Sequence, residues 1–256
     1  MNNPNIIVET SYGKIIVNNN DYIGKEIIKT GYWEIDDIRL VEIIILELMK
    51  KKTGRDFHFY DIGANIGTYS LAIGNLDSRL KVTAFEAQAQ IYYMLCGTVA
   101  INGLRNVVCK NAAVSESVGE ILEIRIPDYT KDGSFGSVEL IKPIYSDNQK
   151  FLFTNTEKIN TLTIDSLSGD IDFIKIDVEG MEDKVLKGGR EKIAAHRPVV
   201  YVEIYKTDRN FVISFFRDLD YVLYIDESTF NLIAFPRELG FGLTNSKWKL
   251  LPDNYF

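Results

Sequence analysis

The 256-residue sequence has only two cysteines and two histidines, and this scarcity removes several classes of protein. Cys96 and Cys109 cannot build the disulfide framework of a small secreted domain, so we interpret them as free thiols in a reducing compartment. His58 and His196 fall in different predicted elements. A transition-metal centre needs several imidazole or thiolate ligands together, so no such metal site is expected.

Long apolar runs and basic clusters are also missing. No run reaches the roughly 18 residues of a membrane-spanning helix, and the first residues lack the basic and apolar regions of a secretory signal. The net charge is −7 with a pI near 5.0, and no Lys/Arg stripe is interleaved with aromatic residues. These absences predict a cytoplasmic protein with no transmembrane segment and no nucleic-acid partner.

Strands and helices alternate along most of the chain, which predicts an α/β fold with a mostly parallel sheet covered on both faces. The predicted strands are residues 57–63, 80–87, 106–114, 171–180 and 198–204, with a closing antiparallel pair at 221–227 and 230–235. Helices are predicted at residues 68–76, 90–104, 181–196 and 210–220. Residues of about 115–168 break the alternation and predict a β-rich insertion over one end of the sheet.

The first 35 residues are interpreted as an accessory segment, and residues 36–256 as the main domain. A glycine between two β-rich runs predicts a hairpin at residues 5–19, and a helix is expected at 36–54 with Asp36 as its cap. Tyr32 and Trp33 either cover a ligand or staple this helix to the core. In the insertion, the residues around Phe135 form either a mobile lid or an ordinary turn.

A glycine-bearing turn follows the strand at residues 57–63 and has the pattern D-x-G-x-N-x-G, from Asp61 through Gly63 and Asn65 to Gly67. Glycines at a strand-to-helix junction let the backbone turn sharply and let a ligand approach. A P-loop would require Gly-Lys-Ser/Thr, and a dinucleotide fold would require G-x-G-x-x-G; neither is present. Asn65 is the non-glycine type that best tolerates positive φ.

An acid ends the next strand. Glu86 lies 19 residues after Gly67, where a carboxylate can accept both hydroxyls of a ribose, or can instead serve as an N-cap for the following helix. Two further acids and a lysine occur in "FIKIDVEG", where Lys175 and Asp177 lie on the same side of a strand. They either bridge each other structurally or face a ligand.

Together these stretches resemble the FkbM-type family of S-adenosylmethionine-dependent methyltransferases. The matching pieces are "DIGANIGTYSL", "FEAQAQIYYML", "NVVCKNAAVSES", "TLTIDSL" and "FIKIDVEGMEDKVLKGG", in residues of about 57–205. The resemblance implies a Rossmann-like class I methyltransferase fold and methyl transfer to a hydroxyl oxygen of a sugar, glycolipid or natural product.

The resemblance also places the cofactor. The backbone at Gly63, Ala64 and Asn65 is expected to face the amino-acid half of S-adenosylmethionine, and Glu86 its ribose. The complete set of cofactor-binding candidates is Asp61, Gly63, Ala64, Asn65, Gly67, Glu86, Ala87, Gln88, Asn111 and Ala112.

The catalytic candidates are Lys175, Asp177, Glu179 and Glu203. A hydroxyl nucleophile must lose its proton, so a carboxylate or a metal near the acceptor is useful. An oxygen-only cluster could hold Mg²⁺, although nothing else in the sequence supports one. The Asn/Asp-Pro-Pro-Tyr/Phe turn of enzymes that methylate amino groups is replaced by "IDVEG", which argues against nucleobase methylation.

Two other functions stay open at this stage: a nicotinamide-dependent oxidoreductase, disfavoured by the missing G-x-G-x-x-G, and a non-catalytic scaffold that binds S-adenosylmethionine. The acceptor is expected to be a small molecule or a glycan. The sequence leaves its identity and the oligomeric state open, a homodimer included.

Overall fold

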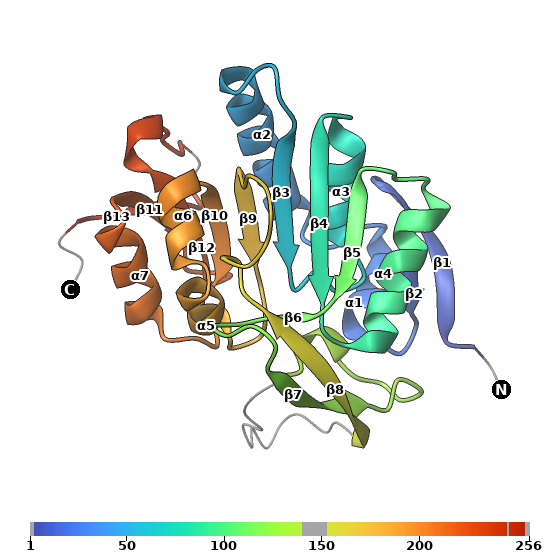
Figure 1. Ribbon diagram of the computed structural model, residues 1–256. Helices are drawn as coiled ribbons and strands as arrows, with labels where there is room; N and C mark the ends of the chain where they lie inside the picture. The colour runs from blue at the N-terminus through green and yellow to red at the C-terminus, as the bar shows by residue number, and fades with distance from the viewer. Residues whose placement is uncertain (1–2, 140–152, 245, 254–256) are drawn as a thin grey trace.

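The computed structural model describes residues 3–139, 153–244 and 246–253 and is built around an eight-stranded sheet (Figure 1). Its strand order is β13-β11-β12-β10-β9-β3-β4-β5. The parallel strands are β5 (Val107–Asn111), β4 (Leu80–Glu86), β3 (Phe57–Ile62), β9 (Phe173–Ile176) and β10 (Val199–Glu203). Strands β12 (Asn231–Pro236), β11 (Tyr221–Asp226) and β13 (Lys249–Leu251) continue it in antiparallel fashion.

The predicted class I methyltransferase fold, with its mostly parallel sheet, is therefore confirmed. The closing antiparallel pair is also present, and β12 returns between β10 and β11 as part of it. The short strand β13 was not predicted. Within the described ranges, no helix combines the length and the apolar character needed to cross a bilayer.

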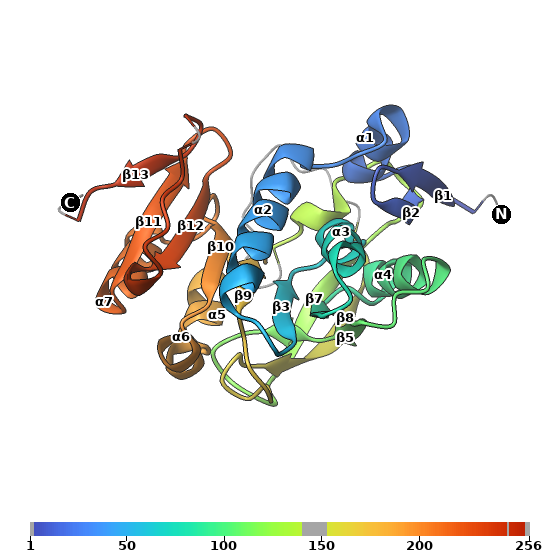
Figure 2. The ribbon, with the colours of Figure 1, turned by 90° about the horizontal axis from the view of Figure 1, so that it is seen from above.

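Helices cover both faces of the sheet, as Figure 2 shows. On one face lie α2 (Ile35–Lys51), α3 (Thr68–Leu76) and α4 (Ala89–Ile101); on the other lie α5 (Glu182–Lys187), α6 (Arg190–His196) and α7 (Arg209–Asp218). The central strand β3 shows the consequence. Phe57 and Phe59 pack among residues of α2 and α3, whereas Tyr60 and Ile62 join the opposite core. Burial on both sides explains why this strand is an almost continuous apolar run.

The helix predicted at residues 181–196 is two short helices, because the Gly188–Gly189 pair interrupts it. A Cβ added at Gly188 would lie 2.1 Å from the carbonyl oxygen of Ser115. The glycine therefore lets the beginning of the insertion pack directly on this helical segment. Residues far apart in sequence set the break, so helical periodicity alone missed it.

The insertion forms a small sheet beyond the carboxyl ends of the parallel strands (Figure 1). It contains β6 (Ala113–Val114), β8 (Phe153–Leu162) and β7 (Ile121–Pro127), in that order, with the 3-10 turn η1 (Phe135–Ser137) between β7 and β8 along the chain. The prediction of a β-rich insertion is right. The single strand expected at 106–114 is divided between the two sheets.

The N-terminal segment contains the predicted hairpin, β1 (Asn5–Thr10) and β2 (Gly13–Asn18), and a helix that was not predicted, α1 (Tyr22–Thr30). Its apolar residues pack against α3 and α4, in a cluster that includes Ile15, Val17, Leu71 and Met94. The prediction that Asp36 caps α2 was wrong, because the helix begins at Ile35. Asp36 lies in the first turn instead, where its negative charge interacts favourably with the helix dipole.

Candidate active site

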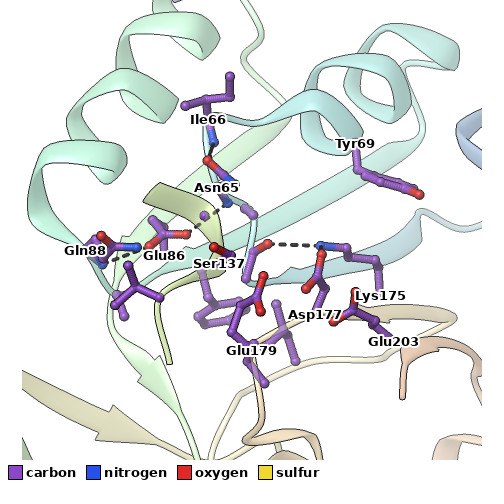
Figure 3. A pocket seen from close by; sticks show the side chains of 18 of the residues that line it. Asn65, Ile66, Tyr69, Glu86, Gln88, Ser137, Lys175, Asp177, Glu179 and Glu203 are labelled. Carbon is purple, nitrogen blue, oxygen red and sulfur yellow. Dashed lines mark hydrogen bonds and ion pairs between the residues drawn. The ribbon is translucent and has the colours of Figure 1, made fainter. Parts of the chain in front are cut away.

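A cavity of about 250 Å³ opens at the carboxyl ends of the central strands, where open α/β sheets bind their ligands. Its floor comes from the ends of β3, β4, β9 and β10, and its roof from the N-terminal segment and residues 134–138. Figure 3 shows the side chains that converge there. Glu86 and Gln88 lie at one end, Lys175, Asp177 and Glu203 at the other, with Asn65 between them.

The glycine turn is fixed by its neighbours on both sides. Gly63 and Ala64 donate their backbone N–H groups to the carbonyl oxygen of Phe85, and Asn65 donates its own to Glu86. Gly63 has φ +79°, and a Cβ there would lie 1.8 Å from the carbonyl oxygen of Asp177. Only glycine fits between β4 and β9 at this point. Asn65 has φ 51°, as its residue type suggested.

Glu86 does not cap α4, whose N-cap is Gln88 and has no capping hydrogen bond from a side chain. One carboxylate oxygen accepts the N–H of Asn65 (3.0 Å), and the other accepts the N–H of Gln88 (2.8 Å), just before α4 begins. Burial raises the pKa of Glu86 to about 7. Since each carboxylate oxygen can accept a second hydrogen bond, the side chain remains able to receive two ribose hydroxyls from the cavity.

Seven of the ten predicted cofactor residues line the cavity: Gly63, Ala64, Asn65, Glu86, Ala87, Gln88 and Ala112. The other three support it from behind. Asp61 is buried and accepts the Ser70 hydroxyl (2.6 Å). Asn111 donates its amide to the carbonyl oxygens at the end of β4. Gly67, the N-cap of α3, has φ +93° and lies against Leu95.

Lys175 links the glycine turn to the acidic end of the cavity. Its buried ammonium donates to the Gly63 carbonyl (3.0 Å) and to Asp177 (3.1 Å), and lies 3.8 Å from Asp61. Burial by itself lowers the pKa of Lys175, but the charges of Asp177, Asp61 and Glu34 outweigh burial and raise it. The bridge that the sequence allowed between Lys175 and Asp177 is therefore present, and it adjoins the cavity.

Three of the four catalytic candidates form a group of acids. Oxygen atoms of Asp177, Glu179 and Glu203 lie within 4.8 Å of one another, a spacing at which they could share a proton or hold a cation. Burial, then the charge of Asp177, raises the pKa of Glu179 to about 7 and that of Glu203 to about 9. Within the described part of the chain, the Glu203 carboxylate accepts no hydrogen bond.

Contacts beside the roof involve two residues that sequence reasoning missed, Lys206 and Asp21. Lys206 pairs with Glu179 and also donates to the carbonyl oxygen of Ser137, so it joins the acids to η1. The turn at Phe135 is well anchored: its N–H donates to Asp21, and its carbonyl oxygen accepts the Gln88 amide. No local sequence signal pairs these residues, because each contact spans tens of residues.

The sequence comparison identifies the family. Residues 61–224, well over half of the chain, match the methyltransferase FkbM domain. The chain belongs to the FkbM methyltransferase family. This membership supports S-adenosylmethionine-dependent methyl transfer and argues against the oxidoreductase alternative. No curated protein matches the chain.

Similar solved structures are distant. The methyltransferase FkbM from Methylobacillus flagellatus KT is 20% identical, with a TM-score of 0.49; the match covers 70% of this chain but only 44% of that one. An rRNA methylase from Streptococcus thermophilus is 12% identical over 77% of this chain and 93% of its own, with a TM-score of 0.46. Magnesium protoporphyrin IX methyltransferase from Synechocystis PCC 6803 with bound SAM is 10% identical. The match covers 83% of this chain and 82% of that one, with a TM-score of 0.44. None of them indicates the acceptor of this FkbM family member.

The cavity fits the cofactor of the FkbM family in its donor and acceptor groups. Glu86 offers a buried carboxylate to a ribose diol, and the opposite end offers acids to a ligand that carries positive charge. Between them, the turn at Gly63 brings backbone close to the cavity. We expect the adenosine to lie beside Ala87, Gln88 and Ala112.

Glu86→Ala is expected to lower the affinity for S-adenosylmethionine by about tenfold to a hundredfold, because a charge-assisted hydrogen bond to the ribose is lost. Isothermal titration calorimetry measures this directly. The exposed Glu47→Ala serves as a control and should bind normally. Undiminished binding by a folded Glu86→Ala protein would contradict the placement of the ribose.

Proposed function

We propose that this enzyme methylates a hydroxyl oxygen of a sugar, glycolipid or natural product. The observation that carries the proposal is the carboxylate of Glu203, which faces the cavity without a hydrogen-bond partner among the described residues, beside Asp177 and Glu179. A hydroxyl is a weak nucleophile until a base accepts its proton. An unengaged acid at the acceptor end of the cavity is suited to that task.

The order of strands suggests different roles for Asp177 and Glu203. The glycine turn follows β3, Asp177 follows the adjacent β9, and Glu203 ends β10, the next strand along the sheet. Bound S-adenosylmethionine supplies a methyl group activated by its sulfonium. The ion pair with Lys175 holds Asp177 beside the turn, whereas Glu203 lies one strand further away, where an incoming hydroxyl would enter. Either acid can accept the proton.

The same features argue against a nucleic-acid acceptor. Four carboxylates, those of Glu34, Asp177, Glu179 and Glu203, line this end of the cavity, and the whole chain has a net charge of −7. The ionised members of this group repel phosphate groups. The absence of an Asn/Asp-Pro-Pro-Tyr/Phe turn after β9 removes the groups that usually hold a planar amino-bearing base.

The test is a panel of acceptors incubated with the enzyme and S-adenosylmethionine: neutral sugars, glycolipids, hydroxylated natural products, amines and RNA. Formation of S-adenosylhomocysteine measures turnover, and mass spectrometry locates the new methyl group. We expect methylation of oxygen in the first three classes. Methylation confined to nitrogen, or to RNA, would refute the proposal.

The same assay decides whether the acids act with a metal. If Asp177, Glu179 and Glu203 only accept protons, activity in excess EDTA should equal activity without it. If activity is lost in EDTA and restored by Mg²⁺, the three acids hold a cation that activates the hydroxyl instead.

A further inference from the structure

Glu34 adopts a strained backbone conformation directly before α2. Its φ is 47°, and six described residues other than glycine have positive φ. Three of the six, Glu34, Asn65 and Glu179, line the same cavity. Left-handed conformations at residues other than glycine cost free energy and concentrate at functional sites. Glu34 shares this property with residues of the cofactor turn and of the acid group, although it lies outside the segment that matches the family.

The side chain of Glu34 does not serve the helix that follows it. Glu34 is the N-cap of α2, yet its carboxylate makes no capping hydrogen bond. Asp21 and Asp208, at the same position of α1 and α7, both cap with their carboxylates. The Glu34 carboxylate instead accepts the hydroxyl of Tyr69 (3.2 Å), which lines the cavity. Capping therefore does not explain either the residue type or its conformation.

Glu34 lies at the end of the cavity opposite Glu86. Its partner Tyr69 is in the first turn of α3, and the Lys175 ammonium lies 5.3 Å from the centre of the Tyr69 ring. Figure 3 shows Tyr69 and Lys175 together on the far side of Asn65 from Glu86. A ligand whose ribose lies at Glu86 and whose chain crosses the turn at Gly63 would end near Glu34.

The turn itself cannot bind the charged end of such a ligand alone. The N–H groups of Gly63, Ala64 and Asn65 are all used within the protein, and the Gly63 carbonyl oxygen already accepts the Lys175 ammonium. An α-ammonium group brings three donors and a positive charge. A carboxylate at the end of the turn is the complementary partner.

We propose that Glu34 binds the α-ammonium group of S-adenosylmethionine, with the Tyr69 hydroxyl holding the Glu34 carboxylate in place. This inference rests on the proposed position of the cofactor ribose at Glu86. The contact is a charge-assisted hydrogen bond, which is shorter and stronger than a neutral one. Desolvation of its carboxylate at the cavity, then the charge of Asp177, raises the pKa of Glu34 to about 7 although the residue as a whole is exposed, so a bound cation would relieve an unfavourable charge. The N-terminal segment thereby completes the cofactor site.

Three ligands test the inference by calorimetry: S-adenosylmethionine, S-adenosylhomocysteine and 5′-methylthioadenosine, which lacks the amino-acid half. Glu34→Gln should weaken binding of the first two by about tenfold to a hundredfold and leave that of the third unchanged. Tyr69→Phe should show the same pattern with a smaller loss, because the carboxylate remains but is less well held.

Two further variants serve as controls. Asp36→Asn removes an exposed acid two residues away and should bind all three ligands normally. Glu86→Ala should weaken all three, since each contains the ribose. Normal binding of S-adenosylmethionine by Glu34→Gln overturns the inference, and so does an equal loss for 5′-methylthioadenosine. Should Glu34→Gln fail to fold, Tyr69→Phe decides by the same criterion. No acceptor is present, so failure of the proposed oxygen methylation would not affect these results.

Discussion

Glu203→Gln is expected to lower turnover by about 10²- to 10⁴-fold, the usual contribution of a general base. Glutamine keeps the shape of the side chain but cannot accept the proton of a hydroxyl. The affinity for S-adenosylhomocysteine should change by less than about twofold, because Glu203 lies one strand beyond the acid nearest the cofactor turn. Steady-state kinetics and calorimetry measure the two quantities separately.

The pH dependence of activity tests the role of Glu203 in a second way. Burial and the neighbouring acids raise the pKa of Glu203 to about 9, so at neutral pH the cofactor-free enzyme keeps this carboxyl mostly protonated. Because a base must be deprotonated to act, kcat/KM of the natural enzyme, which reports the free enzyme, should rise with pH toward about 9. Glu203→Gln should lose that rise.

A structural role for Glu203 would give different results. Thermal stability would fall, and activity would fall only in proportion to the folded fraction. Glu227→Gln, on an exposed glutamate paired with Lys249, is the matched control and should be as active as the natural enzyme. Unchanged rates in both Glu203→Gln and Asp177→Asn would rule out a catalytic role for these acids.

Lys175→Met is expected to lower the free energy of unfolding by about 3–5 kcal/mol, the usual effect of removing one partner from a buried ion pair. The substitution leaves Asp61, which is fully buried, and Asp177 without their cation, and it removes the hydrogen bond to the Gly63 carbonyl. Urea unfolding followed by circular dichroism measures the loss. Binding of S-adenosylmethionine should weaken as well, since the turn is no longer held.

Two comparisons show whether unpaired buried charge causes the loss of stability in Lys175→Met. Adding Asp61→Asn to Lys175→Met should restore part of the stability, because it removes a buried charge that has no partner. Lys50→Met breaks only an exposed pair with Glu47 and should cost less than about 1 kcal/mol. A loss below that value in Lys175→Met would mean that the buried network contributes little.

The sequence by itself determined the architecture and the main features of the site. Strand and helix periods, and the acids that end strands, are local properties, so β3, β4, β9 and β10 could be predicted with the residues that follow them. The turn at Gly63 was recognisable because glycine and asparagine tolerate conformations that other residues avoid. Glu86, Asp177 and Glu203 reach one cavity because parallel strands end at the same edge of a sheet.

Only the tertiary structure decided which polar side chains face the cavity and which support it. Asp61 was predicted to bind cofactor, but it points into the protein, toward Ser70 and Lys175. Glu34 was not singled out, yet its carboxylate meets Tyr69, 35 residues later, across the site. Strand and helix periods predict which residues share a face of an element. Contacts between distant segments form only when the chain packs. The geometry of those contacts sets where each carboxylate points.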